Sequence, residues 1–261
     1  CLVGSEMCIR DSLPPGDHCI VSAMEHNAVM RPLLQLSGVA FDRIPCDAEG
    51  RFDPAAIPSL IRPNTRLCLI AHASNVCGTV QDAEAVGEIC AAHGVAFALD
   101  AAQTAGHIPI DFAKLGLSAL CAPGHKGLLG PHGTGALWVA DGVTLAPLRQ
   151  GGTGSASESM FQPRIMPDSL ESGTLNLPGI AGLYAGMRFA LAHQQEARET
   201  TAALCGMMRD ALLEMAGVRV YTRADASLLS FNVAGIASQV VASALDEQGL
   251  SLIHISEPTR H

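Results

Sequence analysis

Short apolar runs rich in β-branched residues alternate along the first half of this chain with longer segments that carry apolar residues at helical spacing. The runs predict strands and the spaced segments predict helices, because strand faces repeat about every 2 residues and helix faces about every 3.6. This alternation favours an α/β fold, a mostly parallel sheet with helices on both faces. The predicted strands are residues 19–22, 39–44, 67–71, 95–99, 118–122 and 134–139, and the predicted helices are residues 27–36, 53–62 and 82–93.

The pattern changes after residue 150. An irregular stretch reaches residue 178, and a long helical region follows over residues 179–215. Two strands are then predicted at 218–221 and 228–232, with a last helix at 237–248. We therefore expect a large domain over residues 13–195 and the start of a smaller α+β domain over residues 196–250.

The two ends of the chain lack the periodicity of the rest. Residues 1–12 and 251–261 resemble translated sequencing-adapter sequence, and we expect both segments to be non-native. On this interpretation the native segment is truncated on both sides. Ordinary tails at each end are the alternative.

Composition narrows the function classes. The formal net charge is −9 and the sequence holds no run of basic residues, which argues against nucleic acid or an anionic membrane as a principal partner. No apolar stretch reaches the roughly 18 residues needed to span a bilayer. The nine cysteines are irregularly spaced without a C-x-x-C pair, and the ten histidines show no zinc-type spacing. We predict reduced thiols, no metal site and a cytoplasmic location.

The candidate chemistry lies where strands end. Lys126, one of two lysines, stands in a glycine-rich turn beside His125, and Asp100 ends a buried apolar run. Ligands of such sheets bind beyond the carboxyl ends of the strands, so these side chains are expected at one rim. An amine that can hold an aldehyde and an acid that can pair with a ring nitrogen are the minimum for pyridoxal 5'-phosphate (PLP) chemistry.

Five blocks extend this pairing into a family resemblance. Their order resembles that of class V, fold-type I PLP-dependent enzymes, and most of all the cysteine desulfurase-like branch, over about residues 16–250. The resemblance implies a fold-type I PLP-transferase. The blocks are Met24-Glu25-His26-Asn27-Ala28, Ser74-Asn75-Val76-Cys77-Gly78-Thr79, Asp100-Ala101-Ala102-Gln103, Gly124-His125-Lys126 and Glu171-Ser172-Gly173-Thr174-Leu175-Asn176.

The resemblance assigns roles around the cofactor ring. Lys126 would carry PLP as a Schiff base and then move the Cα proton of the substrate. His26 would stack on the pyridine face and aid proton transfer. Asp100 would pair with the ring nitrogen, Gln103 would donate to the phenolate oxygen, and Asn75 would lie near that oxygen and the substrate carboxylate.

At the phosphate end, the resemblance implies His125 as a ligand. It also implies that Thr174 reaches the phosphate of a neighbouring subunit's cofactor, which predicts a homodimer with shared active sites. The chain departs from the family at Pro123, where many relatives carry a phosphate-binding Ser or Thr. The upstream phosphate loop, the persulfide cysteine and the carboxylate-binding arginine would all lie outside residues 13–250, so we expect the chain by itself to be inactive.

The resulting hypothesis is a PLP-dependent enzyme like cysteine desulfurase. Such an enzyme converts a small amino-acid substrate, L-cysteine, to L-alanine and passes the sulfur to an acceptor cysteine, which would lie outside this chain. A sulfur-acceptor protein is then a further expected partner. A class V aminotransferase, a selenocysteine lyase or an epimerase is the enzymatic alternative. An inactive PLP-fold fragment or a non-catalytic scaffold is the alternative of another class. A nucleotide-binding domain is disfavoured because no G-x-G-x-x-G follows the first strand.

Overall fold

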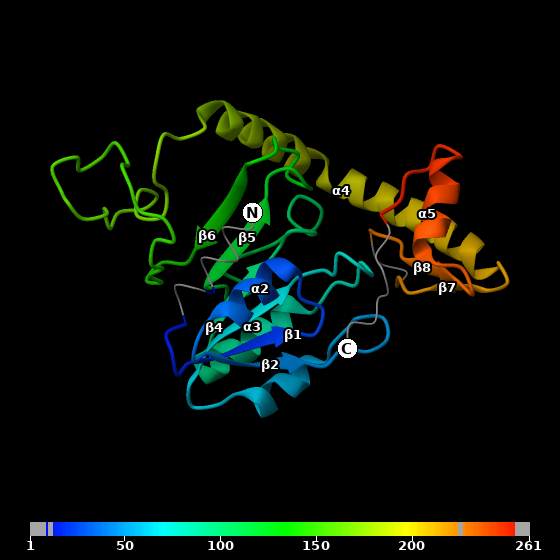
Figure 1. The fold of residues 1–261 in the computed structure, drawn as a ribbon, viewed down its shortest axis with the longest axis horizontal. Coiled ribbons are helices and arrows are strands. Elements are labelled where there is room, and N and C mark those ends of the chain that lie inside the picture. The colour runs from blue at the N-terminus through cyan, green and yellow to red at the C-terminus, as the bar shows by residue number, and fades with distance from the viewer. Residues whose placement is uncertain (1–8, 10–12, 224–226, 254–261) are drawn as a thin grey trace.

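The computed structural model describes residue 9 and residues 13–223 and 227–253. Within these residues the largest element is a six-stranded sheet of order β2-β1-β3-β4-β5-β6 (Figure 1). Neighbouring strands run parallel except β5 and β6, which are antiparallel. The predicted mostly parallel sheet is therefore present, with one antiparallel edge. Its strands are β1 (His18–Ser22), β2 (Ala40–Ile44), β3 (Thr65–Ala71), β4 (Ala96–Asp100), β5 (Ala119–Pro123) and β6 (Gly135–Val139).

Helices cover both faces of this sheet. Alternate strand residues point to opposite faces, so Ile20 packs in one buried cluster and Val21 in another. The first cluster includes residues of α3 (Ala83–His93) and of the 3₁₀ helix η1 (Pro54–Leu60). The second includes residues of α2 (Asn27–Gln35). The strands are thus fixed between two apolar layers, which holds their carboxyl ends in place.

Local sequence signals explain where the helices begin and end. The Asp82 carboxylate accepts the Ala85 amide at 3.0 Å at the start of α3, and Gly94 ends that helix with a φ of 66°. The helix predicted at 53–62 is shorter and of the 3₁₀ type. Pro54 and Pro58 both lack an amide hydrogen, which limits the hydrogen bonds available to a full α-helix there.

The C-terminal part is built on one long helix, α4 (Leu177–Leu213), followed by the antiparallel pair β7 (Val218–Val220) and β8 (Phe231–Val233) and by α5 (Ser238–Asp246). The α4 helix crosses above the sheet in this view and leads to β7, β8 and α5 on the right (Figure 1). It also runs without a break through residue 195, so the domain division expected there stays a prediction.

The chain ends are described only in part. Residues 1–8, 10–12 and 254–261, in the segments expected to be non-native, lie outside the described residues. Ile9 is buried in the apolar layer that contains α2. The seven cysteines among the described residues are free thiols, and the described helices include none long and apolar enough to cross a membrane. The described residues also hold no metal-binding cluster of His, Cys, Asp or Glu.

Candidate active site

A cavity of about 280 Å³ lies at the carboxyl edge of the parallel strands. It is formed by segments that follow β1, β3, β4 and β5, because parallel strands bring these ends to one edge of the sheet. Six of the seven predicted site residues line it. They are His26, Asn75, Asp100, Gln103, His125 and Lys126.

Close backbone packing explains why the lysine turn is rich in glycine. A Cβ atom on Gly124 would lie 2.1 Å from Thr134 Oγ1, and one on Gly127 would lie 2.3 Å from the Ala105 carbonyl oxygen. Only glycine permits both approaches. The turn after β5 is therefore held against the turn after β4, and Lys126 comes to line the same cavity as Gln103.

Asp100 is the last residue of β4 and is only 6% exposed. Its Oδ1 atom accepts the Ala102 amide at 2.9 Å, and its backbone oxygen accepts the His72 amide at 2.9 Å. A carboxylate in the wall of a cavity can accept a charge-assisted hydrogen bond from a cationic group that enters the cavity. This position suits a carboxylate that holds a protonated ring nitrogen.

His26 has a local role that orients its imidazole. It is the N-cap of α2, and its Nδ1 atom accepts the Ala28 amide at 3.0 Å. An amide can only donate, so Nδ1 carries no hydrogen and the proton of the neutral ring lies on Nε2. The sequence predicted a strand followed by a histidine, but not that the helix start would set its tautomer.

His72 follows β3 directly and supports the site, although it is not among the predicted site residues. Burial lowers the pKa of His72 to about 4, so the ring is neutral at physiological pH. Its Nδ1 atom lies 2.9 Å from Thr104 Oγ1. This hydrogen bond ties β3 to the turn that carries Gln103. No motif signals it, because the two residues are far apart in sequence.

His125, Pro123 and Thr174 are the residues that the resemblance relates to a cofactor phosphate. His125 stacks on His132 with ring centroids 4.9 Å apart. Pro123 lines the cavity at the position where the family resemblance implied a phosphate-binding Ser or Thr, and a proline side chain has no hydroxyl to donate. Thr174 is exposed and is not among the described residues that line the cavity.

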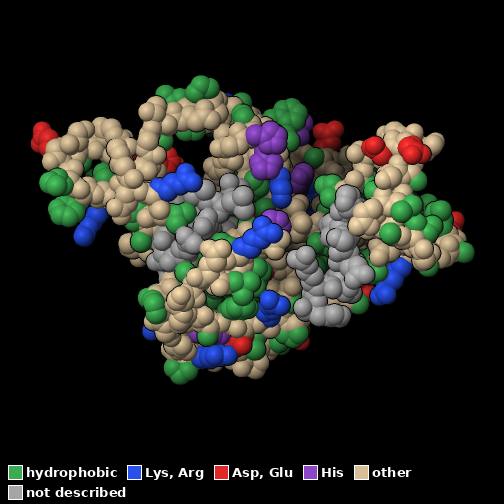
Figure 2. All heavy atoms as spheres, viewed as in Figure 1, with side chains coloured by type: hydrophobic (Ala, Val, Ile, Leu, Met, Phe, Trp, Pro, Cys, Tyr) green, Lys and Arg blue, Asp and Glu red, His purple; other side chains and the backbone are tan. Residues whose placement is uncertain are grey.

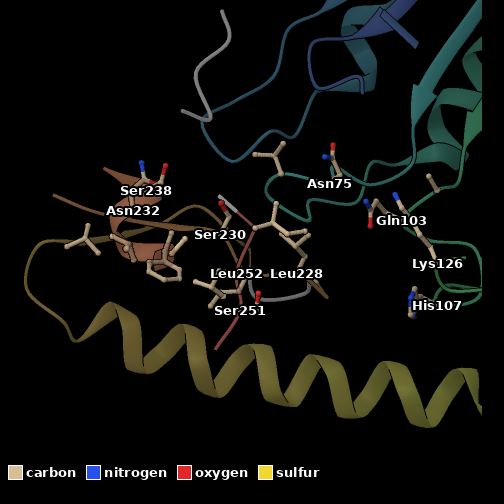
Figure 3. A pocket seen from close by; sticks show the side chains of 18 of the residues that line it. Asn75, Gln103, His107, Lys126, Leu228, Ser230, Asn232, Ser238, Ser251 and Leu252 are labelled. Atoms are coloured by element: carbon tan, nitrogen blue, oxygen red, sulfur yellow. The ribbon is translucent and has the colours of Figure 1, made fainter. Parts of the chain in front are cut away.

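A second cavity of about 630 Å³ adjoins the first and shares Asn75, Ala102, Gln103 and Lys126 with it. Lys126 and Gln103 face it from the sheet side, and Leu228 and Ser230 approach from the C-terminal part (Figure 3). The sequence did not predict these C-terminal lining residues, because β7 and β8 carry no motif. The other lining residues are Val76, His107, Gly127, Leu229, residues 231–233, Ser238, Val241, Ala242 and residues 251–253.

Comparison with known proteins identifies the family to which a chain with this site is similar. The profile of the family described as aminotransferase class-V matches residues 6–254. The probable cysteine desulfurase of Methanothermobacter thermautotrophicus is 37% identical over 180 residues, which cover 67% of this chain and 45% of that protein. The cysteine desulfurase CsdA of Escherichia coli is 32% identical over 251 residues, which cover 93% of this chain and 62% of that protein.

The fold prediction is confirmed by solved structures. The crystal structure of Escherichia coli CsdA in its S-sulfonic acid form matches with a TM-score of 0.89 at 30% identity. The match covers 96% of this chain and 66% of that one. The chain spans about half to two thirds of the length of these relatives. The similarity to cysteine desulfurases that the five blocks predicted is likewise confirmed.

Proposed function

We propose that this chain, which belongs to the aminotransferase class-V family of PLP-dependent enzymes, binds PLP in the 280 Å³ cavity and presents it to an amino acid in the adjoining 630 Å³ cavity. The observation that carries the proposal is the position of Lys126 in the walls of both cavities. An amine shared by a cofactor cavity and a substrate cavity can first hold an aldehyde and then act on a substrate.

The residues present fit this cofactor. When bound, PLP supplies an aldehyde that takes up an amine and a ring that accepts electrons. The buried Asp100 carboxylate would hold the ring nitrogen as a cation, and the Nε2 hydrogen of His26 would be available over the ring. Gln103 and Asn75 would donate to the ring oxygen. His125 would bind the phosphate, which Pro123 cannot do because its side chain has no hydroxyl.

For the reaction we propose desulfuration of L-cysteine to L-alanine, with the sulfur passed to an acceptor. The cysteine desulfurases among the relatives support this choice. In this proposal Lys126 Nζ moves the proton at the substrate Cα, and the apolar side chains of the C-terminal part limit the access of water. The proposed substrate is thus a small amino acid, with a sulfur-acceptor protein as a further partner.

We also propose a homodimer in the cytoplasm. Thr174 is exposed and accessible to a neighbouring subunit, and large apolar side chains of the same irregular stretch, such as Phe161 at 85% exposed, suit an interface. Exposed hydrophobic side chains gather over the outlying loop on the left of the molecule (Figure 2). Free cysteine thiols support a reducing compartment.

Exchange of the Cα proton tests the central step. The chain is incubated with PLP and L-alanine, the product of the proposed reaction, in D₂O, and the Cα proton is followed by NMR. We expect exchange above the rate of free PLP in the wild type and in Lys114→Ala, but not in Lys126→Ala. Exchange that survives in Lys126→Ala would contradict the role of this lysine. Sulfide release from L-cysteine tests the choice of reaction only in a longer protein that also carries the persulfide cysteine, because the chain by itself is expected to release none.

A further inference from the structure

A second carboxyl group, that of Glu25, lies behind the cavity wall and has no part in the proposed chemistry. Its Oε1 atom accepts the Ser22 hydroxyl at 2.5 Å and the Ala71 amide at 2.9 Å. Its Oε2 atom is buried and has no hydrogen-bond partner among the described residues. Two donors on one oxygen and none on the other leave Oε2 as the atom where a proton would lie.

Glu25 joins segments that carry site residues. Ser22 is the last residue of β1, and Ala71 is the last residue of β3. Ala71 lines the 280 Å³ cavity and is aligned with Asp100 across the β3–β4 pair. His26 follows Glu25 directly in the sequence. One carboxyl group therefore links the strand ends that position the imidazole and the ring-binding acid.

The surroundings favour the neutral form of this carboxyl. Burial raises the pKa of Glu25 to about 8, against the hydrogen bonds from Ser22 and Ala71, and the charge of Asp100 acts in the same direction as burial. The other titratable groups that face it are the thiols of Cys19, Cys46 and Cys68 on or after β1, β2 and β3. Burial raises the pKa of the Cys46 thiol to about 11 and that of Cys19 further. A hydrogen bond with the Cys90 thiol, then burial, raises the pKa of Cys68, so all three thiols stay neutral near pH 8.

We propose that Glu25 is a positioning residue, a neutral carboxylic acid that ties the end of β1 to the end of β3 and thereby sets His26 and Asp100 in the cavity wall. The proposal rests on the proposed function for the identity of the ligand. The tie itself is a property of the chain without PLP. An ionised Glu25 would place a second negative charge near Asp100 and weaken this arrangement.

The test compares Glu25→Gln, which keeps a neutral group of the same shape, with Glu25→Ala, which removes the tie. Glu88→Gln, at an exposed glutamate on α3, is the matched control. The first measurement is urea unfolding without PLP from pH 4 to pH 9. The second is the PLP dissociation constant over pH 6–9.

Between the ordinary pKa of glutamate and a pH of about 8, Glu25 holds a proton in the folded chain but not in the unfolded chain. Stability contributed by Glu25 is therefore full at low pH and is lost as the pH rises through this window. The ratio of the wild-type to the Glu25→Gln folding constant should fall by up to about tenfold per pH unit there. Glu88→Gln should follow the wild type. A ratio that stays constant with pH would overturn the neutral state of Glu25.

In the PLP titration, we expect Glu25→Gln to bind within about twofold of the wild type at pH 7 and Glu25→Ala to bind at least about tenfold more weakly. Above pH 8 the wild type should lose affinity relative to Glu25→Gln. Equal affinity of Glu25→Ala and wild type would overturn the positioning role. If no variant, wild type included, binds PLP, the proposed function fails, and the unfolding series alone decides whether Glu25 forms the tie.

Discussion

The sheet region, residues 13–139, and the C-terminal region, residues 177–253, are packed in opposite ways. In the sheet region both faces of β1, β3 and β4 are covered, and the side chain of Phe97 on β4 is fully buried in the apolar layer that contains α3. In the C-terminal region α5 has no buried residue, and α4 has three. Large apolar side chains such as Phe189 and Val240 are exposed along these helices.

Because of this difference in packing, the two regions contribute different kinds of wall to the site. The side chains that we propose to bind the cofactor ring follow strand ends fixed by a packed core, which would give a cofactor a pre-formed wall. The wall of the 630 Å³ cavity from residue 228 onward belongs to the thinly packed region. Groups of exposed large apolar side chains are typical of surfaces that a partner chain covers. The identity of the cofactor is therefore more firmly encoded in this chain than the identity of the substrate.

The largest expected effect comes from the core of the sheet region. Phe97→Ala should lower the free energy of unfolding by about 3–5 kcal/mol, because it opens a cavity between covered layers. Val240→Ala, at a side chain that is 58% exposed on α5, should change it by less than about 0.5 kcal/mol. Urea unfolding followed by circular dichroism measures both. Similar losses for the two variants would erase the distinction between the regions.

A smaller effect is expected at the ring end of the site. Asp100→Asn keeps the acceptor for the Ala102 amide but removes the charge, so PLP should bind about 10- to 100-fold more weakly, while the unfolding free energy changes little. The check is a PLP titration by absorbance, with Glu88→Gln as the control. Unchanged affinity would mean that this carboxylate does not face the ring nitrogen.

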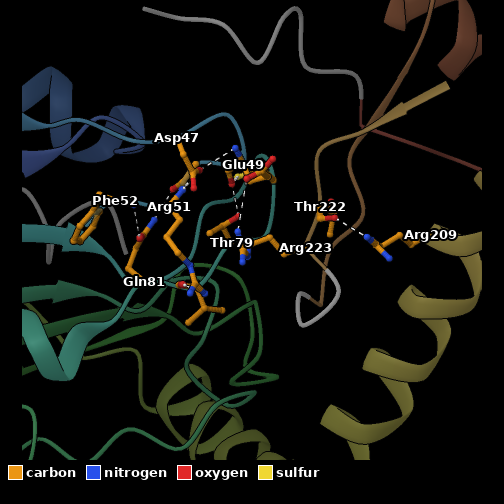
Figure 4. Close-up of polar contacts among 12 residues, drawn as sticks. Asp47, Glu49, Arg51, Phe52, Thr79, Gln81, Arg209, Thr222 and Arg223 are labelled. Carbon is orange, nitrogen blue, oxygen red and sulfur yellow. Dashed lines mark hydrogen bonds and ion pairs between the residues drawn. The ribbon is translucent and has the colours of Figure 1, made fainter. Parts of the chain in front are cut away.

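The smallest effect is expected where the two regions meet. Arg223 lies 3.7 Å from the Glu49 carboxylate, and the Glu49 backbone oxygen accepts hydrogen bonds from Cys77 and Thr79 of the segment after β3 (Figure 4). Both charged side chains are at least a third exposed. Glu49→Gln should therefore cost less than about 1 kcal/mol of stability, and that small loss should vanish in 1 M salt. A loss of several kcal/mol would show that this contact joins the regions firmly.

Much of the sheet region could be predicted from the sequence, because its signals are local. The capping Asp82, the terminal Gly94 and the apolar runs define α3 and its neighbouring strands within a residue or two. Chain order placed Asp100 and Lys126 after parallel strands, and parallel strands end at one edge. The shared cavity of these residues follows from topology rather than from any single motif.

Other features depend on distant contacts and could not be predicted. The Ala71 partner of Glu25 is 46 residues away along the chain, and the hydrogen bond of His72 to Thr104 spans 32 residues. The 630 Å³ cavity combines residues 75–127 with residues 228–253, which no periodicity relates. The roles of Thr174 and of the domain boundary near residue 195 stay predictions.

The most direct measurement is the location of the covalent cofactor link. The chain holds two lysines, so borohydride reduction after incubation with PLP, followed by digestion and mass spectrometry, gives a simple readout. Glu84, which accepts a hydrogen bond from Lys114 at 2.8 Å, raises the pKa of Lys114 and so keeps that amine protonated and poorly nucleophilic. We predict that the adduct lies on Lys126 and is lost in Lys126→Ala but not in Lys114→Ala. An adduct on Lys114, or equal labelling of both lysines, would contradict the account.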